Sequence, residues 1–181
     1  MAFTLTSPAF ENNGMIPAKY TCDGNRELSP PLIISDVPEM AKSLVLIMDD
    51  PDIPEVKKEE FGISAFDHWT LFNIPPETRE IPEGGTVGTP GATTGGELRY
   101  TGPCPPPRFS RSATTMKIQV GSCTHEPPPE HEPSEHRYIF KLYALIAPLE
   151  LPTGARKEQV LDALAPLLLA ETELIGRYSR K

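Results

Sequence analysis

The sequence has no long apolar run, few cysteines and a shortage of positive charge. Without a stretch of about 18 apolar residues it contains no candidate transmembrane helix. Its first residues form neither a basic region nor a long apolar stretch, so no secretory signal is visible and a cytoplasmic location is expected. The 17 lysines and arginines stand against 25 acidic residues, giving a net charge of -8. This balance disfavours nucleic acid or an anionic membrane as a partner.

The cysteines give little sign of a disulfide framework. Only three occur, Cys22, Cys104 and Cys123, and they are too few and too scattered for the pattern of a disulfide-rich domain. Reduced thiols are therefore expected, and the sequence leaves open one alternative, a Cys104–Cys123 bridge.

Proline, in contrast, is abundant, at 22 of 181 residues. Prolines and glycines interrupt nearly every segment, which favours short strands joined by shaped loops over long helices. The chain length and a hydrophobic content of 38% suit one domain, residues 1–181, with a sizeable core.

Three segments are predicted to form the central strands. Residues 44–48 are continuously apolar, which is typical of a strand covered on both faces. Residues 68–74 and 138–145 form the other two.

The segments outside the central strands are less regular. The charged residues 56–60 are interpreted as a loop. Residues 155–164 carry apolar side chains at helical spacing and predict a helix, which Pro166 ends or kinks. Residues 168–178 fit either a helix or a closing strand.

Unusual polar residues accompany these three strands. Asp50 follows the first strand within the turn Asp50-Pro51-Asp52, His68 opens the second, and His136 precedes the third together with Tyr138. If the first strand is antiparallel to the other two, these positions meet at one edge of the sheet. Residues 100–106 lead towards the third strand and can supply a wall, where Gly102 would let a ligand approach the backbone.

The chemistry of this set favours an anion. Asp50 can accept a hydrogen bond from one imidazole, which fixes its tautomer and favours its protonated form. The other imidazole nitrogen then serves as a donor. Such a site would suit a compact oxyanion such as phosphate without a basic surface. An aspartate next to proline is also common turn chemistry, and that plainer interpretation wins for Asp50 taken alone.

Several blocks of the chain resemble the phosphatidylethanolamine-binding protein (PEBP) family. The closer likeness is to its bacterial and archaeal branch, often called Raf-kinase-inhibitor-like, and it covers nearly the whole chain. The resemblance is carried by the blocks at residues 16–24, 29–32, 50–54, 68–73, 102–106, 136–143 and 174–180.

The resemblance implies a mainly β, sandwich-like fold with a large antiparallel central sheet and few short helices. It implies a small non-catalytic pocket for phosphate-type anions, phosphorylated small molecules or phospholipid head groups, and no cofactor. The pocket residues carried over by motif are Asp50, His68, Gly102, Pro105, His136 and Tyr138. The resemblance also implies a protein kinase as a candidate partner and a homodimer as a candidate assembly.

Residues 107–135 depart from the resemblance as a long insertion beside the pocket wall. Residues 114–120 within it could add a strand or hairpin arm. Cys123, His125, His131 and His136 suggest a metal site, but their spacing matches no tight zinc pattern, and a mobile acidic loop is the favoured interpretation.

Two other functions remain open from the sequence. A hydrolase-like enzyme could use an Asp–His pair as general base and orienter, with Cys104 as a weak candidate nucleophile. A protein-interaction module could instead use residues 107–135 as its recognition element.

Overall fold

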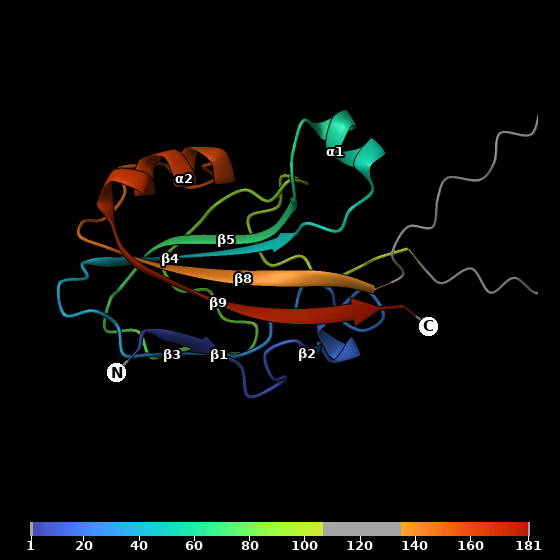
Figure 1. The fold of residues 1–181 in the computed structure, drawn as a ribbon, viewed down its shortest axis with the longest axis horizontal. Helices are drawn as coiled ribbons and strands as arrows, with labels where there is room; N and C mark the ends of the chain where they lie inside the picture. The colour runs from blue at the N-terminus through green and yellow to red at the C-terminus, as the bar shows by residue number, and fades with distance from the viewer. Residues whose placement is uncertain (1, 107–134, 181) are drawn as a thin grey trace, which may run out of the picture.

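The structure, a computed structural model, describes residues 2–106 and 135–180, and two β-sheets dominate them (Figure 1). The larger sheet has the order β2-β9-β8-β4-β5-β7 and the smaller the order β1-β3-β6. The larger contains β2 (Gly14–Met15), β4 (Ser43–Asp50), β5 (Phe66–Ile74), β7 (Thr89–Pro90), β8 (Glu135–Leu145) and β9 (Leu168–Ser179); the smaller contains β1 (Thr4–Thr6), β3 (Leu32–Ser35) and β6 (Glu80–Ile81). The predicted mainly β class is confirmed.

Strand β4 lies at the centre of the larger sheet because its side chains are apolar on both faces. All eight of its residues are buried. It pairs antiparallel with β5 on one side and with β8 on the other, which is the arrangement that brings the end of β4 to the starts of β5 and β8. Among the described strands, only β2 and β9 pair in parallel, over two residue positions.

The two faces of the larger sheet bury different cores. One face packs against the smaller sheet, and β4 contributes Leu44, Leu46 and Met48 to it. The other face packs against a helix, and β4 contributes Val45 and Ile47. The alternation follows from the period of two along a strand. Figure 1 shows the smaller sheet on one side of the larger and both helices on the other.

The helices are few and short, as predicted. They are α1 (Glu55–Phe61) and α2 (Lys157–Leu164), with the 3-10 turns η1 (Ala18–Tyr20) and η2 (Ala165–Leu167). The predicted helix near 155–164 is confirmed as α2, and Pro166 lies in η2.

Two sequence interpretations are corrected or settled. The prediction of a loop at 56–60 is wrong, because these residues form α1, which ends at Gly62 with a φ of 65°. No residue of α1 is buried, so this helix has no buried apolar face, which is the feature whose periodicity predicts a helix. Residues 168–178 belong to the strand β9, which pairs with β8 along its length.

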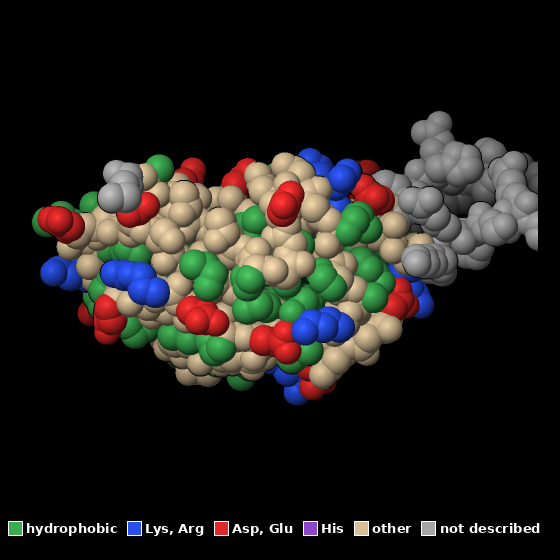
Figure 2. Space-filling view, turned by 90° about the horizontal axis from the view of Figure 1, so that it is seen from below, with side chains coloured by type: hydrophobic (Ala, Val, Ile, Leu, Met, Phe, Trp, Pro, Cys, Tyr) green, Lys and Arg blue, Asp and Glu red, His purple; other side chains and the backbone are tan. Residues whose placement is uncertain are grey.

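The outer surface carries charges of both signs. On the face seen in Figure 2, acidic and basic side chains are scattered among apolar ones, and the described residues form no continuous basic patch there. No helix in the described part of the chain is long and apolar enough to cross a membrane.

Candidate functional site

The turn after β4 is fixed by two aspartates. The Asp52 N–H donates to Oδ1 of Asp50 at 2.9 Å. The Asp52 carboxylate in turn accepts three hydrogen bonds from Arg137, one from its backbone N–H and two from its guanidinium, at 2.7–2.9 Å. The guanidinium holds the pKa of Asp52 below its usual value. This bidentate contact ties the turn to β8 beside His136.

Asp50 and His136 form a buried pair. His136 Nδ1 lies 2.7 Å from Asp50 Oδ2, and the exposed fractions of the two residues are 2% and 3%. Because a carboxylate only accepts hydrogen bonds, Nδ1 of His136 carries a hydrogen and donates the hydrogen bond to Asp50. The Nε2 atom of His136 has no hydrogen-bond partner among the described residues.

His68 approaches Asp50 from β5. Its Nδ1 lies 2.6 Å from the carbonyl oxygen of Thr101, and because a carbonyl only accepts, this nitrogen is the donor. Its Nε2 lies 4.0 Å from Asp50 Oδ2, too far for a hydrogen bond. Burial lowers the pKa of His68, although the Asp50 charge and the Thr101 carbonyl act in the opposite direction.

A β-bulge accounts for the direction of His68. Met48 pairs with Trp69, but the next residue, Asp49, pairs with Asp67, so His68 is an extra residue in β5. A bulge re-aims the local side chain and increases the twist of the strand. His68 therefore lies on the same face of the sheet as Asp50, with its ring centroid 5.3 Å from that of Tyr138.

Tyr138 completes the set two residues after His136 on the same face of β8. It is fully buried, and its hydroxyl lacks a hydrogen-bond partner within the described residues. Burial, followed by the nearby Asp50 charge, raises its pKa far above the usual value, so it remains a neutral donor. We call Asp50, His68, His136 and Tyr138 the histidine cluster.

The segment from Tyr100 to Pro106 lies beside the histidine cluster. The Gly102 N–H donates to the carbonyl of Arg26 at 2.6 Å, and a Cβ on Gly102 would collide with the carbonyl oxygen of Tyr20 and crowd the Cα of Thr21. Glycine is thus required at position 102 because another part of the protein's own backbone approaches it closely. Pro105 is buried. The structure brings this segment to the cluster through Thr101, a contact that the sequence did not reveal.

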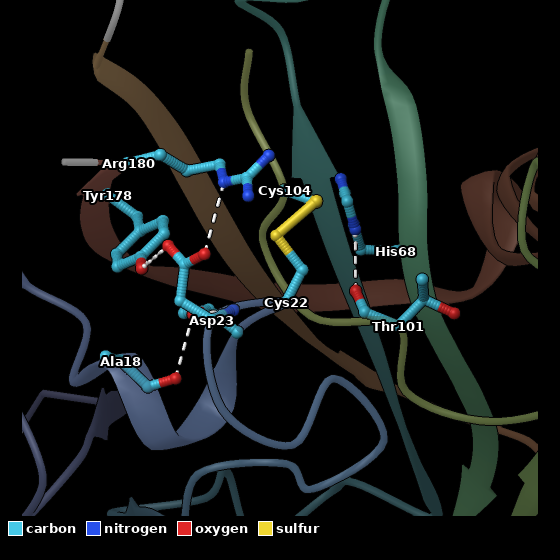
Figure 3. The surroundings of a disulfide bond; sticks show 9 residues. Ala18, Cys22, Asp23, His68, Thr101, Cys104, Tyr178 and Arg180 are labelled. Atoms are coloured by element: carbon cyan, nitrogen blue, oxygen red, sulfur yellow. Dashed lines mark hydrogen bonds and ion pairs between the residues drawn. A yellow bond between two sulfur atoms is a disulfide. The ribbon is translucent and has the colours of Figure 1, made fainter. Parts of the chain in front are cut away.

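A disulfide holds the same segment. Cys22 and Cys104 are bonded, with their Cα atoms 5.3 Å apart, and Figure 3 shows the bond near His68 and Thr101. The expectation of reduced thiols is wrong, and so is the alternative of a Cys104–Cys123 bridge. Adjacent backbones explain the pairing, since the Cys22 N–H donates to the carbonyl of Pro103 at 3.0 Å.

The cluster offers hydrogen-bond donors and a proton-binding pair rather than an evident nucleophile. Cys104, the candidate nucleophile, is bonded to Cys22. No group of metal-binding side chains occurs within residues 2–106 and 135–180. Cys123, His125, His131 and the strand expected at 114–120 lie outside the described residues.

Fold and cluster together define a β-sandwich protein with a buried carboxylate–imidazole site at one end of its central sheet. A family model described as phosphatidylethanolamine-binding protein matches residues 6–112 and 120–179. The UPF0098 protein of Methanothermobacter thermautotrophicus is 38% identical over 183 residues, covering 97% of this chain and 98% of that protein. A UPF0098 protein of Chlamydia trachomatis is 37% identical over 177 residues, with coverages of 97% and 98%.

Solved structures show the same likeness. The PEBP homologue CT736 from Chlamydia trachomatis is 36% identical, with a TM-score of 0.79 and 99% of each chain covered. E. coli YbcL, described as a member of the mammalian PEBP family, has the same fold, with a TM-score of 0.73, full coverage of both chains and 23% identity. The chain therefore belongs to the phosphatidylethanolamine-binding protein family, and the resemblance identified from its sequence is confirmed.

Proposed function

We propose that this protein is a non-catalytic binding protein whose histidine cluster binds a phosphate-type anion, either free or as part of a phosphorylated small molecule or phospholipid head group. The observation that carries the proposal is a pair of buried atoms without partners. His136 Nε2 and the Tyr138 hydroxyl are two of three such side-chain atoms in the described part of the chain. Buried polar atoms usually have hydrogen-bond partners, so these two support a polar ligand.

Charge balance makes the proposed binding depend on protons. Asp50 is negative, so an anion is repelled while both imidazoles are neutral. Two imidazolium groups against one carboxylate leave the histidine cluster positive. Because burial lowers the pKa of His68, this residue is mainly neutral at pH 7. Anion binding should therefore take up protons and strengthen as the pH falls.

Access to the cluster is restricted. The exposed fractions of its four residues lie between 0% and 7%, the largest belonging to His68. An incoming anion therefore has to displace part of what covers the cluster. This favours a compact group such as phosphate, and it predicts slow association compared with an open surface site.

The decisive experiment is a calorimetric titration with phosphate, phosphoethanolamine and ethanolamine at pH 6 and pH 8. We expect the two phosphorylated ligands to bind more tightly at pH 6, with proton uptake, and ethanolamine not to bind. His136→Gln should abolish the binding. Equal affinity at both pH values, or unchanged binding by the variant, would contradict the proposal, and the choice between the first two ligands reveals any head-group preference.

A protein kinase partner and a homodimer are proposed on the family resemblance alone. A cytoplasmic location is also proposed, as expected from the sequence. The enzymatic alternative is less well supported, because the disulfide occupies the thiol of Cys104. The alternative of an interaction module depends on residues 107–135, and deleting residues 108–134 would test it. Loss of partner capture with intact anion binding would favour that alternative.

A further inference from the structure

A second group of charged side chains lies on the opposite face of the central sheet. Asp49 follows Val45 and Ile47 along the face that packs against α2, and it pairs across β4 and β5 with Asp67. Lys157, the first residue of α2, places Nζ 2.7 Å from Asp49 Oδ1. Lys141 of β8 places Nζ 3.7 Å from Asp49 Oδ2. We call these four residues the lysine cluster.

A cavity of about 280 Å³ opens beside this cluster. Asp67 and Lys157 line it and are almost fully buried, with exposed fractions of 2% and 8%. Arg156 and Glu158 line it and are exposed. The buried residues therefore belong to its interior and the exposed ones to its rim. None of the residues of the histidine cluster lines this cavity.

One wall of the cavity is held firmly between two elements. The Asp67 N–H donates to the Thr94 hydroxyl oxygen at 2.8 Å, and the Thr94 N–H donates to the Asp67 carbonyl at 3.1 Å. The Ala92 N–H donates to the carbonyl of Ala155, just before α2, at 3.0 Å. Residues 92–96 thus join the start of β5 to the start of α2, and the wall is pre-formed.

The interior of the cavity contains the carboxyl group of Asp67, which can accept further hydrogen bonds. Asp67 accepts from the Trp69 N–H at 3.0 Å and from the Thr70 hydroxyl at 2.8 Å. Each carboxylate oxygen of Asp67 thus accepts one hydrogen bond from the described residues, and each can accept another. Lys157 is already engaged by Asp49, so the lysine cluster contains more buried carboxylate than buried ammonium.

The rim offers a cation that has no partner within residues 2–106 and 135–180. The Arg156 guanidinium makes no hydrogen bond or ion pair to any described residue. It stands directly before α2, whose first-turn N–H groups also favour negative charge. Glu158 lies on the same rim and reduces the net positive charge there, so a simple anion gains little. The cavity therefore presents a carboxyl group in its interior and a guanidinium at its rim.

We propose that this cavity binds a small zwitterion of the α-amino-acid class, with its ammonium group on Asp67 and its carboxylate at Arg156 and the start of α2. The cavity volume lies just below the range typical of drug-sized ligands, which limits the ligand to a small molecule. The proposed binding of the zwitterion does not involve the histidine cluster, so it can be tested separately from anion binding.

The proposal carries a pH signature. Burial, followed by the Asp49 charge, raises the pKa of Asp67 to about 7, while Lys157 and the two hydrogen bonds act in the opposite direction. The ammonium group needs the ionised carboxylate. Affinity should therefore fall roughly tenfold per pH unit below about pH 7, and above it should stay constant for as long as the ligand's ammonium group remains protonated.

The test is a titration of the full chain with L-alanine, ethylammonium and propionate, followed by calorimetry and by the amide NMR signals of Thr94 and Gly95. Ethylammonium is alanine without its carboxylate, and propionate is alanine without its ammonium group. We expect saturable alanine binding that shifts both amide signals, and at least about tenfold weaker binding of the other two. Ethylammonium or propionate binding as tightly as alanine would overturn the zwitterion assignment.

Variants locate the two ends. Asp67→Asn and Arg156→Gln should each weaken alanine binding about tenfold or more, and Asp67→Asn should also remove the pH dependence. Arg79→Gln is the matched control, the same change at an exposed arginine that does not line the cavity, and it should leave affinity within about threefold. If Asp67→Asn fails to fold, Arg156→Gln on the exposed rim still decides. No alanine binding by the wild type, or unchanged affinity in Arg156→Gln, would overturn the proposal.

Discussion

Asp49 and Asp50 are neighbours on one strand, yet they belong to opposite faces of the central sheet and to different electrostatic environments. Asp50 is paired with the buried imidazole of His136. Asp49 accepts a hydrogen bond from the buried ammonium group of Lys157. The comparison shows how one strand end can serve two clusters, one in which a carboxylate is paired with an imidazole and one in which it is paired with an ammonium group.

The largest expected effect comes from removing the buried cation. Lys157→Met would leave Asp49 desolvated, with only the more distant Lys141. We expect the free energy of unfolding to fall by about 3–5 kcal/mol, measured by urea denaturation at pH 7. Lys141→Met is the matched control and should cost less than about 1 kcal/mol, because Lys141 is 38% exposed and lies 3.7 Å from Asp49. Equal losses in the two variants would contradict the assignment of Lys157 as the principal partner.

Asp67 should make stability depend on pH with a sign opposite to that of an ordinary carboxylate. Its pKa is raised from 3.8 to about 7, so the folded state binds the proton more tightly than the unfolded state. The stabilisation is fully present below about pH 4 and is lost as the pH rises to about 7. Asp67→Asn removes this titration.

We therefore expect the wild type to lose up to about 4 kcal/mol relative to Asp67→Asn between pH 4 and pH 8. Urea denaturation of both proteins across that range measures the difference. Parallel stability curves would show that Asp67 keeps an ordinary pKa and that its burial has been compensated by its neighbours.

Tyr138 and Tyr143 lie on opposite faces of β8, so replacing each of them by phenylalanine compares the two faces of the sheet. Tyr138 faces the histidine cluster, and Tyr143 belongs to the core on the α2 side. Tyr138→Phe should weaken phosphate binding about tenfold, since a hydrogen bond to a charged group contributes about 1.5–3 kcal/mol. It should not reduce stability, because the hydroxyl has no partner among the described residues.

Tyr143→Phe is the control and should leave phosphate affinity unchanged. Calorimetry on both variants at pH 6 makes the comparison. Equal weakening in both variants would mean that the tyrosine effect is indirect and that the Tyr138 hydroxyl does not contact the anion.

The smallest effect is expected at the turn that positions Asp50. Asp52→Asn removes the charge of the contact to Arg137, whose side chain is 53% exposed, so we expect a loss of only about 1 kcal/mol. Because the folded pKa of Asp52 is lowered, its contribution is present above pH 3.8 and is lost as the pH falls through the folded pKa. Glu135→Gln, which removes the charge from the longer contact to Arg177 at 3.2 Å, is the control and should cost less.

The sequence predicted the histidine cluster because its geometry depends on strand order. A buried run followed by Asp50, and two later strands that begin near His68 and His136, need only an antiparallel arrangement to meet. The family resemblance added the segment near Gly102, which lies beside the cluster through Thr101.

The rest depends on contacts that leave no local pattern. The bulge at His68 is visible only from the pairing of β4 with β5. Lys157 reaches Asp49 across 108 sequence positions, and Cys22 meets Cys104 across 82. Such contacts arise from tertiary packing rather than from periodicity, so neither the lysine cluster nor the disulfide could be predicted from spacing.

The disulfide also makes the protein sensitive to the redox conditions of its surroundings. It closes a loop of 82 residues, a constraint worth about 4–5 kcal/mol against the unfolded chain. Where glutathione keeps thiols reduced, the segment that carries the Thr101 carbonyl would be held only by its noncovalent contacts, among them its backbone hydrogen bonds and the buried Tyr100 side chain. Two preparations of identical sequence, one exposed to a reductant and one not, would then differ in how firmly His68 is oriented.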